Sequence, residues 1–231
     1  EEGRQHPMLS VLHEMKPKND FFESSSDSPV AQMSDQEFLQ AKATYFGLMT
    51  EIDEQLGRIF DYLKATNQYD STLIVFTSDH GEQLGDHYLF GKLGYFDASY
   101  HIPLIIRDPQ RQLQKVKTLE HFSESVDVMP TILDWLGLEI PDQCDGRSLL
   151  PFLENEVPRN WREEVHSEFD FRWIGSYQPM IEERFGLLPD ECSLVIIRDD
   201  DYKYVHMTAL PPLFFDLKRD PGEFINRVQD P

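Results

Sequence analysis

The sequence predicts an α/β fold followed by a small antiparallel subdomain, and three patterns along the chain support this. An amphipathic pattern over residues 35–64 is typical of a long helix with one apolar face. This helix leads into the apolar run 72–77, and a helix feeding such a strand is half of a βαβ unit. From about residue 151 the pattern changes to short segments joined by acidic turns. We therefore predict a first domain over residues 1–150 and an antiparallel α+β subdomain over residues 151–231.

The predicted long helix has a clear start signal. Ser34 followed by Glu37 forms a capping box, in which each side chain satisfies an unpaired amide at the helix start. Apolar residues then recur three or four positions apart and form one continuous stripe: Phe38, Ala41, Tyr45, Leu48, Ile52, Leu56, Ile59 and Leu63. We expect this stripe to pack in the core, which makes the helix a scaffold element.

Two apolar strands and a second helix are expected next. Residues 72–77 are apolar and rich in β-branched side chains, as in a strand buried on both faces of a parallel sheet. A second apolar strand covers residues 103–106. Residues 127–136 are interpreted as a helix, with Asp127 as a plausible cap and Gly137 at its end.

Four short strands are predicted in the C-terminal part, at residues 164–171, 193–198, 202–207 and 213–217. The run Asp199-Asp200-Asp201 between two of these strands suggests the tip of a hairpin. Three polar residues alternate along one face of the first strand: His166, Glu168 and Asp170. They could bind a metal ion, but we favour a solvated or subunit-contact face.

The charge of the chain restricts its partners. Lysine and arginine number 21 against 42 acidic residues, which gives a formal net charge of −21. Such an acidic surface repels nucleic acid and anionic membranes, so neither is expected as a partner. It also repels an anionic substrate, unless a bound cation inverts the local field. If the substrate is a small anion, this conflict of charges indicates a metal site.

The two cysteines, Cys144 and Cys192, are too few for a disulfide framework or a zinc cluster. We interpret both as buried thiols in a reducing compartment and expect a cytoplasmic protein. No apolar run is long enough to span a membrane, and residues 1–10 lack the pattern of a signal peptide.

Residues 78–92, SDHGEQLGDHYLFGK, carry the candidate chemistry. Ligands of open α/β sheets sit outside the carboxyl ends of the strands, and Asp79 and His80 follow the apolar strand directly. A carboxylate oxygen and an imidazole nitrogen together suit a divalent cation. Lys92 returns a positive charge thirteen residues after Asp79, and a flexible ammonium suits an anionic oxygen of the substrate. Gly81, together with Gly85 and Gly91, allows the backbone to turn and to pass close to a ligand.

Each of these residues also has an ordinary structural interpretation. An aspartate after a strand is usually a helix cap or turn former. A single histidine is more often a packed, hydrogen-bonded side chain than a ligand, and a single lysine is nearly always solvated. The combination favours a metal- and anion-binding segment over these separate interpretations.

Several stretches of the chain resemble a known family. The string TSDHGEQLGDHYLFGK, followed by Tyr95 and HIPLIIRDP, looks like the sulfatase branch of the alkaline-phosphatase superfamily, with the phosphonate monoester hydrolases closest. Further matching segments are ATYFGLMTEIDEQLGRIFDYL, SESVDVMPTILDWLG, CDGRSLLPFL and YKYVHMTALPPLFFDLKRDPGEF. The resemblance implies the C-terminal portion of an alkaline-phosphatase-like sheet sandwiched by helices, with the small antiparallel subdomain after it.

The resemblance also implies roles for individual residues. Asp79 and His80 would be metal ligands, most often for manganese or calcium in this family, and Lys92 would contact the non-bridging or leaving-group oxygen of the ester. His87 would be a substrate contact or a residue behind the ligands, and an orienting role in the loop is about equally favoured. Glu82 is taken as structural.

The nucleophile of this family is a cysteine or serine matured to formylglycine within a C/S-x-P-x-R motif, and this sequence contains no such motif. We therefore expect the chain to be a C-terminal fragment that is inactive alone, and the open edge of its sheet predicts a homo-oligomer. Two alternatives remain open: an alkyl or aryl sulfatase, and a non-catalytic binding or assembly module that reuses the fold.

Overall fold

The computed structural model describes residues 6–15, 33–111, 118–154, 156–171 and 184–230. It separates into two compact units, one of Glu1–Gln112 with Arg172–Glu191 and one of Leu113–Phe171 with Cys192–Pro231. Each unit combines residues from both sides of the predicted boundary at residue 150, and the two predicted domains stay a prediction. None of the helices within the described ranges combines the length and apolar character needed to cross a bilayer.

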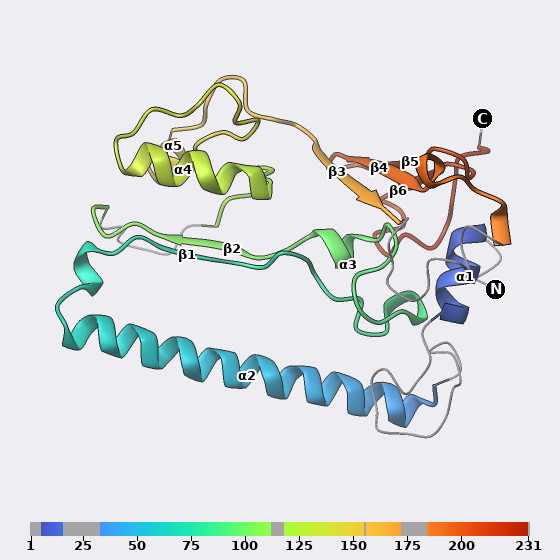
Figure 1. The fold of residues 1–231 in the computed structure, drawn as a ribbon, viewed down its shortest axis with the longest axis horizontal. Helices are drawn as coiled ribbons and strands as arrows, with labels where there is room; N and C mark the ends of the chain where they lie inside the picture. Colours follow the sequence, from blue (N-terminus) through green and yellow to red (C-terminus); the bar gives the residue numbers. More distant parts are fainter. Residues whose placement is uncertain (1–5, 16–32, 112–117, 155, 172–183, 231) are drawn as a thin grey trace. The chain divides into compact units, whose positions relative to one another are not determined.

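The first unit begins with helix α1 (Pro7–Met15) and the long helix α2 (Asp35–Ala65), drawn in blue to cyan in Figure 1. The predicted capping box of α2 is confirmed. The Glu37 amide donates to Ser34 Oγ (3.4 Å), and the Ser34 amide donates to Glu37 Oε2 (2.8 Å). Both amides lack partners within the helix, so the cap fixes where the helix starts.

The predicted burial of the α2 stripe is wrong. No residue of α2 is buried, and Leu48, Ile52 and Ile59 are 53–54% exposed. The two ends of the helix pack against other parts of the first unit: Phe38 stacks on Phe90 (ring centroids 5.5 Å apart) next to buried Met33, and Phe60 contacts Tyr69 of the following turn (6.3 Å). The apolar periodicity predicts the helix correctly, but the described residues leave much of the face that the stripe forms exposed.

The two strands of the first unit are β1 (Ile74–Thr77) and β2 (Leu104–Arg107), with the short helix η4 (Tyr69–Ser71) before β1. They pair with each other in antiparallel register, Thr77 opposite Leu104. The positions are as predicted, but a parallel sheet buried on both faces is not formed by these strands, and every residue of β1 is partly or fully exposed. The chain that connects β1 to β2 contains the short helices η5 (Asp86–Tyr88) and α3 (Asp97–Tyr100). It re-enters the sheet at the end where β1 leaves it, so β2 runs antiparallel to β1.

The second unit contains η6 (Ser125–Asp127), α4 (Val128–Trp135) and α5 (Leu150–Leu153). Gly137 has φ +68° and ends α4, as predicted. Asp127 occupies the N-cap position of α4, as predicted, but its side chain makes no cap hydrogen bond to that helix. Its carboxylate instead accepts from the backbone amides of Glu124 and Arg147, at 2.8 Å each.

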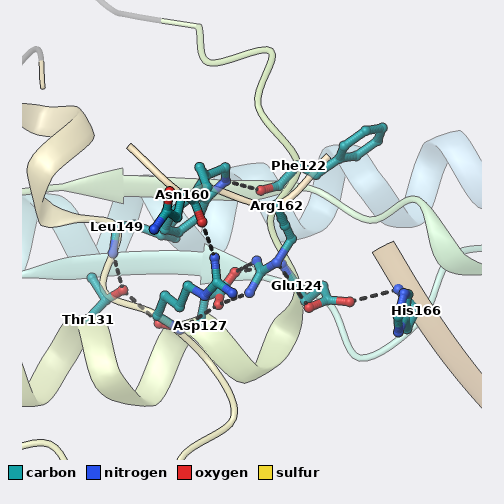
Figure 2. Close-up of polar contacts among 10 residues, drawn as sticks. Phe122, Glu124, Asp127, Thr131, Leu149, Asn160, Arg162 and His166 are labelled. Atoms are coloured by element: carbon teal, nitrogen blue, oxygen red, sulfur yellow. Dashed lines mark hydrogen bonds and ion pairs between the residues drawn. The ribbon is translucent and has the colours of Figure 1, made fainter. Parts of the chain in front are cut away.

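The same carboxylate forms a two-pronged ion pair with the Arg162 guanidinium, one prong of which is Nη2 to Oδ1 at 2.8 Å (Figure 2). Arg162 Nε also lies 3.3 Å from Glu124 Oε2, and Glu124 Oε1 accepts from the His166 amide at 2.8 Å. Asp127 is fully buried, and its hydrogen bond raises the pKa of Arg162. This network ties η6 to the start of the following strand.

The C-terminal part forms a four-stranded antiparallel meander, in orange to red in Figure 1: β3 (Val165–Asp170), β4 (Ser193–Arg198), β5 (Tyr202–Met207) and β6 (Leu213–Asp216). The short helix η8 (Pro189–Glu191), which belongs to the first unit, precedes β4. All four predicted strands and the hairpin are confirmed. At the tip, Asp199 Oδ1 accepts from the Asp201 and Tyr202 amides at 2.7 and 2.6 Å, which is how an aspartate stabilises a tight turn.

Alternation along these strands separates a buried face from an exposed face. The buried face of the meander carries side chains at most 3% exposed: Leu194, Ile196, Val205, Met207 and Leu213. Lys203 is buried among them, and its Nζ lies 2.5 Å from Glu223 Oε1. Of the two cysteines, Cys192 is buried as expected, but Cys144 is only partly buried.

Candidate active-site segment

Asp79 and His80 follow β1 after one intervening residue and lie close together. The Asp79 side chain is 84% exposed and that of His80 is 37% exposed, and Asp79 Oδ2 lies 3.7 Å from His80 Nε2. A divalent cation takes carboxylate oxygens at about 2.0–2.6 Å and imidazole nitrogens at about 2.0–2.1 Å. Two donors at this separation can therefore contact the same ion.

The ring hydrogen bond of His80 uses Nδ1 and leaves Nε2 available as a candidate ligand. His80 Nδ1 lies 2.7 Å from the Gly81 carbonyl oxygen, which can only accept, so Nδ1 carries the proton. Nε2 is then the unprotonated nitrogen, as in metal-bound histidines oriented by a backbone carbonyl. Ser78 Oγ donates to the His80 carbonyl (2.7 Å) and fixes the backbone at the same point. The donor set and the tautomer both fit a divalent cation.

Gly81 is required by a close backbone contact. Its amide donates to the Ser99 carbonyl (2.8 Å), and a Cβ at this position would lie 2.0 Å from the Ala98 carbonyl oxygen. The unusual backbone turn expected at Gly81 is not present, since its φ is not positive; a glycine is needed here because the chain at Ala98 passes too close for a Cβ.

The loop from Glu82 to Gly91 is closed at its base. Glu82 Oε1 accepts from the Leu84 amide (3.1 Å) and the Gly91 amide (2.6 Å), and the Gln83 amide donates to the Gly91 carbonyl (2.9 Å). These contacts agree with the structural role expected for Glu82. Gly85 (φ +93°) and Gly91 (φ +80°) both adopt the left-handed backbone that glycine tolerates best.

Gln83 is a contributor that the sequence did not reveal. Its side chain is completely buried, and its Nε2 donates to Ser99 Oγ at 2.7 Å. Sixteen residues separate the two partners, so no short motif records the contact. Together with the Gly81 amide, Gln83 anchors the segment to α3.

His87 lies inside the loop and is well packed. Its backbone is left-handed (φ 51°), and its ring stacks on Phe96 with centroids 3.6 Å apart and planes 4° from parallel. His13 Nε2 of α1 donates to the His87 carbonyl at 2.7 Å. These are contacts expected of a residue that orients the loop, and a contact with substrate stays a prediction. No sequence pattern indicated that His13 would reach this loop from 74 positions away.

Lys92 is exposed and sits just past the base of the loop, between Gly91 and Gly94, which has φ +108°. The Tyr100 hydroxyl donates to the Gly94 carbonyl (3.0 Å), and burial raises the pKa of Tyr100. The lysine side chain therefore extends from a backbone that is held on both sides. Its role toward a substrate oxygen stays a prediction.

No group of three or more histidine, cysteine or acidic side chains that could hold a metal ion occurs in the part of the chain that the structure describes. His166, Glu168 and Asp170 lie along the exposed face of β3. Asp79 and His80 are thus a pair of candidate ligands.

Comparison with known families now defines the class of protein. Residues 2–138 match the family described as Sulfatase, and residues 85–231 match the family described as N-sulphoglucosamine sulphohydrolase, C-terminal. This chain belongs to the sulfatase family. The expected relationship and the alkaline-phosphatase-like α/β fold are confirmed.

Individual relatives narrow the comparison. The chain is 53% identical over its full length to the multifunctional alkaline phosphatase superfamily protein PehA of Trinickia caryophylli, covering 44% of that protein. It is 31% identical to arylsulfatase K of Gallus gallus, with 95% of this chain and 39% of that protein covered. The chain therefore spans less than half the length of these relatives.

Solved structures agree with this assignment. The phosphonate monoester hydrolase of Agrobacterium radiobacter superposes with a TM-score of 0.91 at 42% identity, over 99% of this chain and 45% of that one. The phosphonate monoester hydrolase from Silicibacter pomeroyi gives a TM-score of 0.86 at 40% identity, over 100% of this chain and 44% of that one. Membership in a family of hydrolases is thus shown at the level of sequence and fold.

Proposed function

We propose that this chain forms the C-terminal part of a metal-dependent hydrolase of phosphonate monoesters and phosphodiesters, and that it supplies two metal ligands and one cationic side chain to the active site. The observation that carries this proposal is the placement of Asp79 Oδ2 and His80 Nε2, 3.7 Å apart just after β1. The similarity to two phosphonate monoester hydrolases supports the substrate class.

In this proposal the chain's own residues bind and orient. Asp79 and His80 hold a manganese or calcium ion, with His80 kept in the required tautomer by the Gly81 carbonyl. When bound, the ion supplies charge stabilisation to the ester oxygens and lowers the pKa of a coordinated nucleophile. Lys92 contributes its ammonium to the departing or non-bridging oxygen, where negative charge develops. Without these cations an acidic chain of net charge −21 would repel the ester.

The attacking group belongs, in this proposal, to a part of the enzyme that precedes the chain. The family resemblance implies a formylglycine there, and the chain by itself is then inactive. We expect the 231-residue chain to show no turnover of an aryl phosphonate monoester, an aryl phosphodiester or an aryl sulfate. Metal-dependent turnover by the purified chain would overturn this part of the proposal.

The test of the substrate class uses the complete enzyme. Turnover of a nitrophenyl phosphonate monoester is expected to exceed that of nitrophenyl sulfate. Lys92→Ala should lower kcat by about 100- to 1,000-fold, the usual cost of removing one group that stabilises developing charge. The matched control is Lys64→Ala, an exposed lysine on α2, which should turn over substrate like the wild type.

A sulfatase is the second candidate, because arylsulfatase K relatives are 29–31% identical over 95% of the chain. Both ester classes present a tetrahedral anion to the same cation, so the described residues do not separate them. Preference for the sulfate in the same assay would establish this second candidate and reject the first.

A further inference from the structure

The proposed metal ligands and Lys92 belong to one continuous segment, and one carboxylate is the side chain that helps to close the loop between them. Glu82 Oε1 accepts from the Gly91 amide at 2.6 Å, and Gly91 is bonded directly to Lys92. Glu82 itself lies two residues after His80. This side chain therefore connects the metal-ligand end of the segment to the lysine end.

The loop needs such a contact because its backbone is strained. Five of its residues have positive φ angles between 50° and 93°: Leu84, Gly85, His87, Tyr88 and Gly91. Three of these are not glycine, and non-glycine residues keep this conformation only when their surroundings hold it. Glu82 Oε1 also accepts from the Leu84 amide at 3.1 Å. One oxygen thus holds the first and the last of the left-handed residues.

The chemistry of the acceptor suits this task. A carboxylate accepts several N–H donors, and its hydrogen bonds are shorter and stronger than those of neutral acceptors. Glu82 is also half-buried, so its bonds compete less with water. A second hydrogen bond, from the Gln83 amide to the Gly91 carbonyl (2.9 Å), also holds the two ends of the loop together.

Resting on the role proposed above for Lys92, we infer that Glu82 is a positioning residue for this lysine: by holding Gly91 it sets the place from which the ammonium reaches the ester. Glu82 itself touches neither substrate nor metal. Removing its carboxylate therefore reduces catalysis only through Lys92, and leaves the affinity of Asp79 and His80 for the metal unchanged.

A double-mutant cycle in the complete enzyme tests this inference. We expect Glu82→Ala to lower kcat by about 10- to 100-fold, as supporting residues of an active site do. The double variant E82A/K92A should be no slower than K92A alone, because a residue acting through Lys92 has nothing left to position. Glu82→Gln keeps an acceptor oxygen and should recover most of the loss, and Glu51→Gln on exposed α2 is the charge-matched control.

Metal affinity and hydrogen exchange separate positioning from loss of structure. Manganese titration of E82A should give the wild-type dissociation constant, and amide exchange should rise only in the peptides that contain Leu84 and Gly91. If E82A does not fold, the cycle is run with E82Q, whose smaller loss should likewise vanish in the K92A background.

The outcomes distinguish the inference from the proposal beneath it. If E82A slows the K92A enzyme by its full single-variant factor, Glu82 acts independently, and the inference is wrong while the function of Lys92 stands. If K92A turns over the phosphonate monoester like the wild type, the role of Lys92 fails, and the inference fails with it.

Discussion

Asp127 illustrates how a single residue holds the second unit together. Its carboxylate is fully buried and accepts from two backbone amides and from the Arg162 guanidinium (Figure 2). A buried charge is tolerated when it is paired and all its oxygens are hydrogen-bonded, and both conditions are met here. Gly146 completes the arrangement, since a Cβ there would lie 2.0 Å from the Val126 carbonyl oxygen.

We predict that Asp127→Ala destabilises the protein by about 3–5 kcal/mol, because it breaks the ion pair with Arg162, which then keeps only Glu124, and leaves the amides of Glu124 and Arg147 without their acceptor. The measurement is the free energy of unfolding from denaturant titration followed by circular dichroism. Asp61→Ala is the control, since this carboxylate is 82% exposed and its removal should change stability by less than about 0.5 kcal/mol. Equal stability of the two variants would contradict the structural role of Asp127.

The role of a single residue could be predicted when its partner is close in the sequence, and not when the partner is far away. Asp79 and His80 are neighbours in the chain, so a short pattern is enough to indicate a ligand pair. Asp127 takes the expected N-cap position, but the partner of its carboxylate, a guanidinium 35 positions away, was not indicated by the sequence. The contact of His13 with the site loop is likewise invisible, because it joins segments 74 residues apart.

At the level of elements, helix α2 shows the largest mismatch between composition and environment. Its apolar stripe is half exposed, although the pattern is that of a core-facing helix. Among the described strands, β1 and β2 pair only with each other. An apolar helix face and strand edges together favour association with another chain or another part of the enzyme.

We predict that the 231-residue chain self-associates in solution through this helix. Analytical ultracentrifugation should show a species heavier than the monomer, and the double variant Ile52→Glu, Ile59→Glu should shift the chain toward the monomer. The physical reason is the loss of two apolar side chains, each worth about 1.5–3 kcal/mol when buried. Glu54→Gln on the same helix should leave the distribution unchanged, and a monomeric wild-type chain would refute the prediction.

The positions of the helices and strands were predicted well, but the direction in which β1 and β2 pair was not. The long helix with its cap, both apolar strands and all four strands of the meander lie where the sequence places them. The antiparallel direction of β1 and β2 was missed, because an apolar run indicates burial and not the direction of its neighbour. The exposure of the α2 stripe was missed for a related reason: periodicity shows which face is apolar, not what covers it.

At the scale of the whole molecule, the net negative charge of the chain and the short part of its relatives that it spans both bear on how the proposed enzyme binds an anionic ester. The chain carries a net charge of −21 and spans 44% of a relative that is 53% identical to it. Binding of an anionic ester to such a chain depends on local cations, and in the proposal these are a metal ion that Asp79 and His80 would hold and the Lys92 ammonium. Two ligands alone bind a divalent ion weakly, so a firmly held metal requires further ligands from the rest of the enzyme.

The metal content of the complete enzyme tests the central claim most directly. After exhaustive dialysis, elemental analysis of the wild type should find about one divalent ion per chain, whereas Asp79→Ala and His80→Ala should each retain less than about a tenth of this amount. His166→Ala, which removes the exposed histidine of β3, should retain the wild-type amount. Full metal occupancy in both D79A and H80A would contradict the account, as would loss of the metal in H166A.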